Sequence, residues 1–136
     1  MKKIIYIVFL SSMMLLSACS GEEKEELTRI DIHEVDAEGN YKEVGTITDS
    51  ESIELIQKTF NQIKWDNKVV NMARQPDIKL ILFYTFDENM PERLIEYEIW
   101  FNENTGTSII VGNKENLSYG ELDKDHTNTL RNYLKR

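Results

Sequence analysis

Cys19 carries the most reactive side chain of this sequence, and it is the only cysteine among 136 residues. Leu16 and the small residues Ser17 and Ala18 stand immediately before it. The chain opens with two lysines, and residues 4–16 are apolar apart from two serines. This order of charge, apolar stretch and small residues is the anatomy of an export signal. The stretch is shorter than the roughly 20 residues that a helix needs to cross a bilayer, so we predict a signal peptide.

The four residues from Leu16 to Cys19 resemble the lipobox of bacterial lipoproteins, which reads Leu, a small residue, Ala or Gly, and Cys. The resemblance implies that the Cys19 thiol receives a diacylglyceryl group with palmitate-type chains, and that residues 1–18 are cleaved off. The chain would then be lipid-anchored to the cell membrane on its extracytoplasmic face. The alternative is an ordinary signal peptide that leaves Cys19 as a free or disulfide-bonded thiol. A lone cysteine cannot form an intrachain disulfide, and an exposed thiol is a liability outside the cell.

The acidic charge narrows the choice of partners. The net charge is −8, and because residues 1–18 hold two lysines and no acid, the remainder has 14 basic and 24 acidic residues, or −10. A nucleic-acid surface needs a basic patch that releases counterions, so we expect no nucleic-acid partner. The same charge opposes electrostatic docking to anionic lipid. Attachment to the membrane would therefore come from the lipid on Cys19, for which two acyl chains suffice.

Glu96 and Glu98 form a carboxylate pair whose spacing suits acid–base chemistry. Two residues apart in a strand, they would share one face at about 7 Å, within the range that glycoside hydrolases use. With 24 acids in the chain, a solvated outer face is the simpler interpretation. Trp100 shares that face, and Trp65 belongs to the surplus of aromatic residues near the same strands. We take Trp65, Glu96, Glu98 and Trp100 as the candidate binding face, with core packing of the aromatic residues as the alternative.

Other chemistry-bearing residues indicate no catalytic site. His33 and His126 lie outside any recognisable Ser/His/Asp motif, and the six glycines do not match a phosphate-binding loop. Asp123, Asp125 and His126 could ligate a metal, but their spacing matches no zinc or calcium pattern, and the aspartates are better explained as helix caps. We predict no metal and no cofactor.

The chain after Cys19 divides into a tether and one domain. Residues 19–26 contain no apolar residue after Cys19 and predict a flexible acidic tether. Residues 27–136 are enough for one α+β domain. Alternating apolar residues predict strands at 27–35, 41–47, 78–86, 93–101 and 107–111, with a short edge strand at 117–119.

Two segments carry apolar residues at helical spacing. The first runs from Thr48 or Asp49 to Ile63; Thr48 and Glu51 have capping-box spacing, and Asp49 is the alternative N-cap. The second runs from Asp123 or Asp125 to the C-terminus, with an apolar stripe that starts at Leu122. Residues 64–77 are irregular and either wrap the sheet or form a short edge strand.

Strands joined by short turns predict an antiparallel sheet of about five or six strands with two helices packed on one face, in the order β-β-α-loop-β-β-β-(β)-α. Residues 78–86 carry apolar side chains on both faces, which predicts a central strand.

From Ile63 onward the pattern is similar to the YhfM-like domain of small lipoproteins of Gram-positive bacteria. The shared features are a helix that ends near 63–65, Val-Val-Asn-Met-Ala at 69–73, Pro76-Asp77 before a strand, Tyr-x-Ile-Trp at 97–100, and Thr129-Leu130 in the closing helix. The resemblance implies the same domain and lends no catalytic residue.

The leading hypothesis is a membrane-anchored, non-enzymatic interaction or accessory module that faces the cell wall and has a protein or cell-wall partner. The alternative is a surface ligand-binding protein or hydrolase that uses the Trp/Glu sheet face. A third hypothesis, a structural spacer or immunity-type inhibitor, also requires a protein partner.

Overall fold

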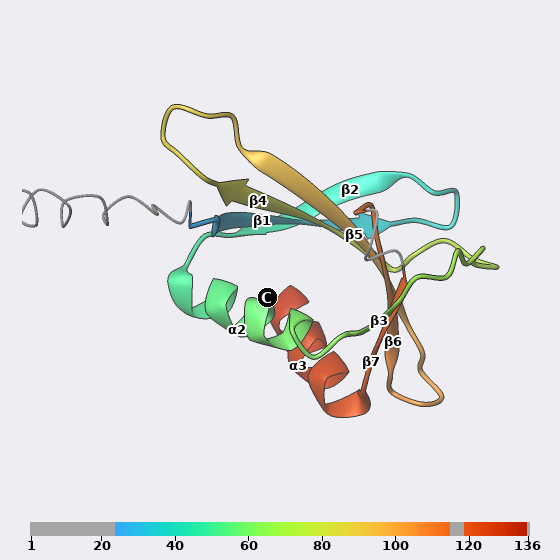
Figure 1. The fold of residues 1–136 in the computed structure, drawn as a ribbon. Helices are drawn as coiled ribbons and strands as arrows, with labels where there is room; N and C mark the ends of the chain where they lie inside the picture. Colours follow the sequence, from blue (N-terminus) through green and yellow to red (C-terminus); the bar gives the residue numbers. More distant parts are fainter. Residues whose placement is uncertain (1–23, 115–118, 136) are drawn as a thin grey trace, which may run out of the picture.

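The computed structural model describes residues 24–114 and 119–135. They form seven strands and two helices (Figure 1). The strands are β1 (Glu26–Val35), β2 (Tyr41–Ile47), β3 (Lys64–Asp66), β4 (Ile78–Thr85), β5 (Arg93–Phe101), β6 (Ser108–Gly112) and β7 (Tyr119–Leu122), and the helices are α2 (Ser50–Phe60) and α3 (Lys124–Leu134).

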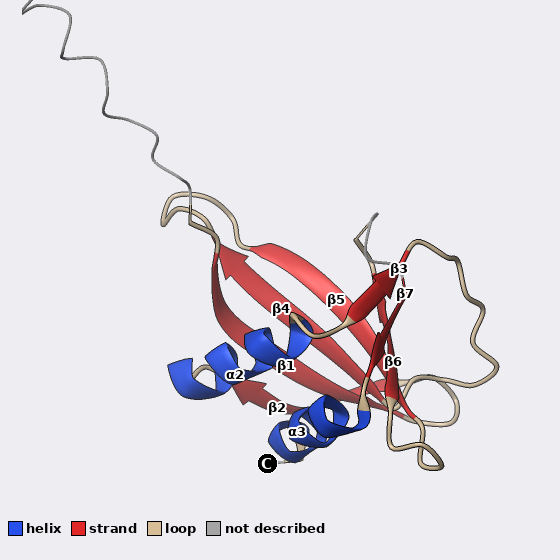
Figure 2. Cartoon of the chain, turned by 60° about the horizontal axis from the view of Figure 1, so that its bottom comes forward, coloured by secondary structure: helices blue, strands red, loops and turns tan. Residues whose placement is uncertain are grey.

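All seven strands join one antiparallel sheet in the order β2-β1-β4-β5-β6-β7-β3. The sheet curls around the two helices, which lie together on its inner face (Figures 1 and 2). The predicted α+β class, the helices on one face and the central position of residues 78–86 are confirmed. The strand count is seven rather than five or six, because β3 closes one edge by pairing with β7.

The core follows from period-two alternation in the strands. Ile30, Leu80, Ile99 and Ile110 are fully buried on the inner face and pack against the helices. A hydrogen bond of 2.9 Å between the buried hydroxyls of Ser108 on β6 and Thr127 on α3 joins sheet and helix. The core cluster of the described residues runs from Leu27 to Leu134, so a chain that begins at Ser20 retains all the side chains of this cluster.

The helix boundaries decide between the N-cap candidates and correct two predictions, the end of the first helix and the place of Leu122. Asp49, not Thr48, is the N-cap of α2, because its carboxylate accepts the Ser52 amide at 2.9 Å. The helix also ends at Phe60 rather than Ile63. Asp123 caps α3 as predicted, but Leu122 is the last residue of β7 and not part of the helical stripe.

Several predictions concern residues outside the described part of the chain. The signal peptide at 1–18, the lipobox residues Leu16, Ser17 and Ala18, and Cys19 all lie there, so the lipid anchor stays a prediction. The predicted short strand at 117–119 lies there except for Tyr119, which begins β7. β7 pairs with β6 and β3, so it is not an edge strand. β1 begins at Glu26, one residue before its predicted start.

Gly120 allows the edge strand β3 to close on the inner face. It is the register partner of Trp65, and a Cβ at Gly120 would lie 2.3 Å from Ile63 Cγ2 and 2.9 Å from Trp65 Cε3. Real Cβ atoms do not approach that closely. The packing of Ile63 and Trp65 therefore requires a residue without a Cβ at position 120.

We predict that Gly120→Ala lowers the free energy of unfolding by about 1–3 kcal/mol, because the added methyl overpacks Ile63 and Trp65. Urea unfolding of the chain that begins at Ser20 measures the change. Gly45→Ala is the matched control, since its Cβ would meet only Ile32 Cδ1 at 3.9 Å. Equal effects of the two substitutions would contradict the assigned role of Gly120.

Candidate functional site

The predicted binding face is divided between the two faces of the sheet. Glu96, Glu98 and Trp100 alternate with Tyr97 along β5, so they lie on the outer face, away from the helices. Trp65 lies on the inner face, with its ring centroid 6.0 Å from that of Tyr97. The face that Trp65 takes depends on the pairing of β3 with β7, which local sequence does not specify. The structure thus brings Glu98 and Trp100 together and places Trp65 elsewhere.

Trp100 lies on the more polar face as predicted, but it is not an exposed anchor. Only 6% of its surface is accessible, and its indole Nε1 donates to the carbonyl of Arg74 at 2.9 Å. Residues 70–77, which have no regular secondary structure, cross over it and cover it. The indole therefore supports this segment, and its edge contributes to the floor of a cleft.

Both glutamates of the predicted pair have partners from other strands of the sheet. Glu96 Oε2 lies 2.7 Å from Lys79 Nζ, and Glu98 Oε1 accepts the Tyr41 hydroxyl at 2.9 Å. The hydrogen bond to Glu98, together with burial, raises the pKa of Tyr41 above its usual value. Tyr41 therefore stays protonated and donates. The two carboxylates belong to a cross-strand polar network on the outer face.

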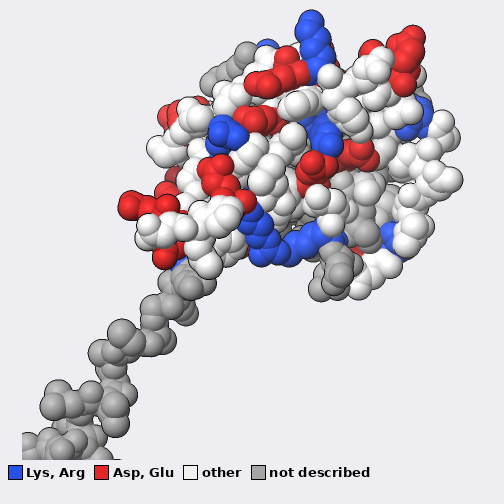
Figure 3. Space-filling view, turned by 90° about the horizontal axis from the view of Figure 1, so that it is seen from above, with Lys and Arg blue, Asp and Glu red and all other residues white. Residues whose placement is uncertain are grey.

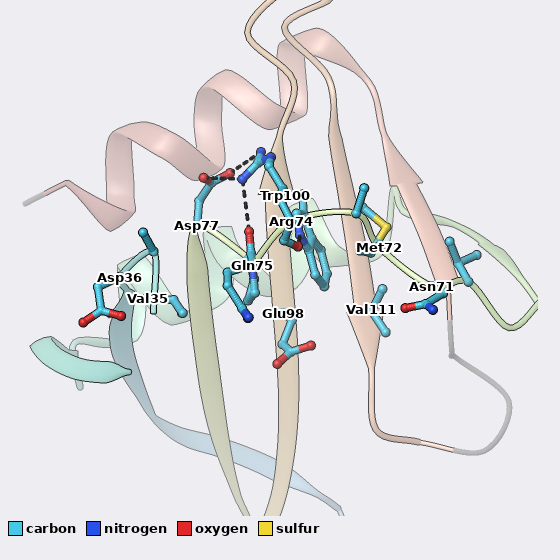
Figure 4. A pocket seen from close by; sticks show the side chains of 14 residues that line it. Val35, Asp36, Asn71, Met72, Arg74, Gln75, Asp77, Glu98, Trp100 and Val111 are labelled. Carbon is cyan, nitrogen blue, oxygen red and sulfur yellow. Dashed lines mark hydrogen bonds and ion pairs between the residues drawn. The ribbon is translucent and has the colours of Figure 1, made fainter. Parts of the chain in front are cut away.

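We call the cavity beneath residues 70–77 the outer cleft. It has a volume of about 780 Å³, within the range of small-ligand sites, and Figure 4 shows its lining side chains. They come from residues 35–37 and 70–77, and from Glu98, Trp100 and Val111. Figure 3 shows acidic and basic side chains interleaved over the outer face of the sheet, without a large patch of one sign.

An ion pair fixes the wall of the outer cleft. Arg74 Nη1 and Nη2 donate to the two oxygens of Asp77 at 2.7 and 2.9 Å, and Nη2 also donates to the Phe101 carbonyl at 3.0 Å. The Phe101 amide donates to Asp77 at 2.7 Å. Burial opposes ionisation of Asp77, but Arg74 and the Phe101 amide outweigh it, so the pKa of Asp77 lies below its usual value of 3.8. These bonds attach an irregular segment firmly to β5.

Apolar residues form the lip of the outer cleft. Val69 is 98% exposed, and the half-buried Val70 and Met72 follow it toward the lining. At the opposite wall, the pKa of the Asp36 carboxyl is lowered, mainly by its hydrogen bonds from Asn40. The cleft combines carboxylates at Asp36 and Glu98 with an Arg74 charge that Asp77 already neutralises. Its unbalanced charge is negative.

We call the second cavity, on the inner face, the inner aromatic pocket. It measures about 410 Å³ and lies between α2 and the strands β1, β4 and β5. Leu27, Ile56 and Leu82 supply its aliphatic surface, and its polar rim is formed by Glu54, Gln57, Lys58 and Asn61. Its aromatic walls are Phe60, Trp65, Tyr84 and Tyr97.

The aromatic side chains of this pocket pack against one another. The rings of Phe60 and Tyr97 meet edge to face at a centroid distance of 4.9 Å. Burial, and then the proximity of Tyr97 and Glu25, raises the pKa of Tyr84 to about 12. Burial also raises the pKa of Tyr97. Both phenols are therefore neutral at physiological pH and can donate hydrogen bonds.

The candidate metal ligands serve as a helix cap. Asp123 accepts the His126 amide at 3.0 Å, and its other oxygen lies 2.7 Å from His126 Nδ1. In residues 24–114 and 119–135, no group of three or more His, Cys, Asp or Glu side chains converges as a metal site requires. No helix of the described chain has the length and apolar character to cross a membrane.

Sequence reasoning missed both cavities as such. The outer cleft depends on Arg74 and Asp77, whose i,i+3 spacing of opposite charges around Pro76 was a usable signal. The inner aromatic pocket depends on Phe60, which appeared as an ordinary residue of the helical stripe. Its contact with Tyr97 joins residues 37 positions apart in the sequence, and no local pattern indicates it.

Comparison with known proteins identifies the family. The model of the YhfM protein family matches residues 23–136. The chain belongs to the YhfM family. This match covers the whole described fold, so the predicted YhfM-like domain is confirmed. No curated protein matches this YhfM-family chain.

The YhfM-family fold is similar to a solved structure, a thioesterase-like protein from Clostridium sporogenes ATCC 15579. The two share 25% sequence identity at a TM-score of 0.51, over 79% of this chain and 93% of the other.

We predict that Asp77→Asn lowers the free energy of unfolding by about 1–2 kcal/mol at neutral pH, because it removes a charged, bidentate partner of Arg74 that is partly screened by solvent. The difference from the unsubstituted chain should shrink as pH falls below 3.8, since the lowered pKa of Asp77 means that its contribution is present above that pH and is lost on protonation. Urea unfolding across pH measures it.

Asp66→Asn is the matched control, because the Asp66–Lys68 pair is exposed and longer, at 3.4 Å. It should change stability by only a few tenths of a kcal/mol. A loss for Asp77→Asn that persists unchanged at low pH would contradict the ion-pair mechanism.

Proposed function

We propose that this YhfM-family chain is a lipoprotein held on the extracytoplasmic face of the cell membrane through Cys19, and that its domain is a non-enzymatic module that binds a protein partner in the outer cleft. The single observation that carries the binding role is the outer cleft itself, with its fixed wall and its exposed apolar lip at Val69. A cavity with a few convergent polar side chains is the usual starting hypothesis for a binding site.

The chemistry of the outer cleft favours a partner segment with basic and apolar residues. Arg74 and Asp77 neutralise each other, whereas Asp36 and Glu98 leave negative charge at the cleft. A lysine or arginine of the partner would complement Asp36 and Glu98, and apolar side chains would cover Val69 and Met72. The wall is attached to β5 before binding, which lowers the ordering cost of association.

The position of the cleft suits a partner that approaches from the wall side. β1 begins at Glu26, and the cleft lies at the other end of the strand, at residues 35–37. Ten residues of strand separate these ends by about 30 Å. With Cys19 in the membrane, the Glu26 end of β1 is proximal, and the Val35 end, which lines the outer cleft, is distal.

We predict that Cys19 carries the anchor. In the unsubstituted protein, mass spectrometry of the N-terminal peptide should find diacylglyceryl on the Cys19 thiol and no residues 1–18. The Cys19→Ala variant should lack this mass. The other lipoproteins in the detergent-soluble membrane fraction should be unchanged. A bare thiol, or a retained leader, would disprove the anchor without bearing on the cleft.

For the binding role, we predict that a photocrosslinking amino acid at Val69 forms one adduct of discrete mass on intact cells. The same amino acid at Asn132, an exposed position on α3, is the control and should form none. Glu98→Lys, which reverses charge in the floor, should abolish the Val69 adduct while circular dichroism remains unchanged. Equal labelling from Val69 and Asn132 would disprove the site.

The alternative function is a ligand-binding protein or hydrolase that uses the Trp/Glu face. Its support is the similarity to a thioesterase-like protein. Against it, Glu96 and Glu98 are engaged by Lys79 and Tyr41, and Trp100 is buried. Turnover of thioester, ester or peptidoglycan substrates by the purified chain, lost in Glu98→Gln, would favour this alternative over the non-enzymatic module.

A further inference from the structure

The inner aromatic pocket lies at the end of the sheet where the chain enters it. Leu27, the second residue of β1, lines the pocket and is the register partner of Tyr84, which also lines it. Only the six residues 20–25 separate Cys19 from Glu26, the first residue of this strand, and these seven residue steps span at most about 25 Å. With the anchor proposed above, the pocket would therefore open close to the membrane surface.

The accessible walls of the pocket are mainly aromatic. Leu27, Ile56 and Leu82 are at most 4% accessible and belong to the core, so the surface that a ligand can touch comes from the half-buried Phe60, Trp65 and Tyr84. The volume of about 410 Å³ is within the range of small-ligand sites. Among the described lining residues, ionisable carboxylate and ammonium groups occur only at the rim, where Glu54 and Lys58 pair with each other at 2.6 Å. The lining that the structure describes thus carries no unpaired charge, and Glu25 lies close enough to Tyr84 and Tyr97 to add to the rise in pKa that burial causes.

The polar groups inside the pocket suit a carbonyl oxygen. Tyr84 and Tyr97 are both on the inner face and both keep their protons at neutral pH. A neutral phenol donates one hydrogen bond, which a carboxyl or ester oxygen accepts. The rim amides of Gln57 and Asn61 provide further neutral donors for a polar head group.

We propose that the inner aromatic pocket binds the acyl chain of a single-chain membrane amphiphile, with the chain against the rings of Phe60 and Trp65 and the carbonyl group at Tyr84 and Tyr97. The placement near the membrane rests on the anchor at Cys19, whereas the recognition chemistry does not. A free fatty acid and a lysophospholipid both supply this chemistry, and the test below includes both.

The two tryptophans allow a direct test, because Trp65 lines the pocket and Trp100 lies on the opposite face. In the chain that begins at Ser20, Trp100→Phe leaves only Trp65 to fluoresce, and Trp65→Phe leaves only Trp100. A brominated fatty acid or a brominated lysophospholipid, below its micelle concentration, should quench Trp65 saturably and leave Trp100 nearly unaffected. Quenching by one probe and not the other would support the site and identify its head group.

Chain length gives a second readout. Octanoate, decanoate and dodecanoate should displace the brominated probe with affinities that rise about fourfold per buried methylene group, until the pocket is filled. Tyr84→Phe, which keeps the ring, should weaken fatty-acid binding about tenfold and preserve the order of chain lengths. Tyr119→Phe is the control, since Tyr119 bonds Glu121 outside the pocket.

A substitution at the rim of the inner aromatic pocket tests binding without changing a core residue. Gln57→Phe adds bulk at the rim and should weaken binding at least tenfold, whereas Asn132→Phe on the exposed face of α3 should not. Equal quenching of Trp65 and Trp100, affinity that does not vary with chain length, or unchanged binding by Gln57→Phe would each overturn the proposal. None of these measurements uses the anchor or the outer cleft, so their failure is distinct from failure of the proposed function.

Discussion

The structure depends on covering the inner face of one curled sheet. Ile30, Leu80, Ile99 and Ile110 are completely buried there, and two amphipathic helices supply the opposite side of the core. Burying a large aliphatic side chain contributes about 1.5–3 kcal/mol, so this layer dominates the stability of a domain of this size. Strand register, helix caps and the close approach at Gly120 all serve to bring the two layers together.

The two helices cover only the inner face of the sheet, so part of the outer face is covered by a segment without regular secondary structure. Trp100 is a large apolar group on the outer face, and both helices lie on the other face of the sheet (Figure 1). Residues 70–77 cover it instead, held by Arg74, Asp77 and the indole Nε1. The outer cleft remains beside this segment. The same strand, β5, thus contributes Tyr97 to the inner aromatic pocket and Trp100 to the outer cleft.

Most of the fold could be predicted because its signals are local. Alternation along 78–86 and 93–101 indicated strands and their faces, and Asp123 indicated where α3 begins. The face of Trp65 could not be predicted, because it depends on the pairing of the three-residue β3 with β7, more than 50 residues away. The N-cap of α2 could not be chosen from the sequence, because Thr48 and Asp49 are adjacent and both have suitable side chains. The structure shows that Asp49 is the cap. The ion pair of Arg74 with Asp77 is local in the sequence. That the segment holding this pair covers Trp100 could be seen only in the folded structure.

β1 also determines how the two cavities relate in space. Leu27, the second residue of β1, lines the inner aromatic pocket, and Val35, its last residue, lines the outer cleft. The two sites lie on opposite sides of the sheet. Occupants of the two sites would have no surface in common and could not compete sterically. One molecule could therefore form a ternary complex, and the two occupants would be linked through β5, which lines both sites, and through residues 65–70, which join Trp65 of one site to Val70 of the other.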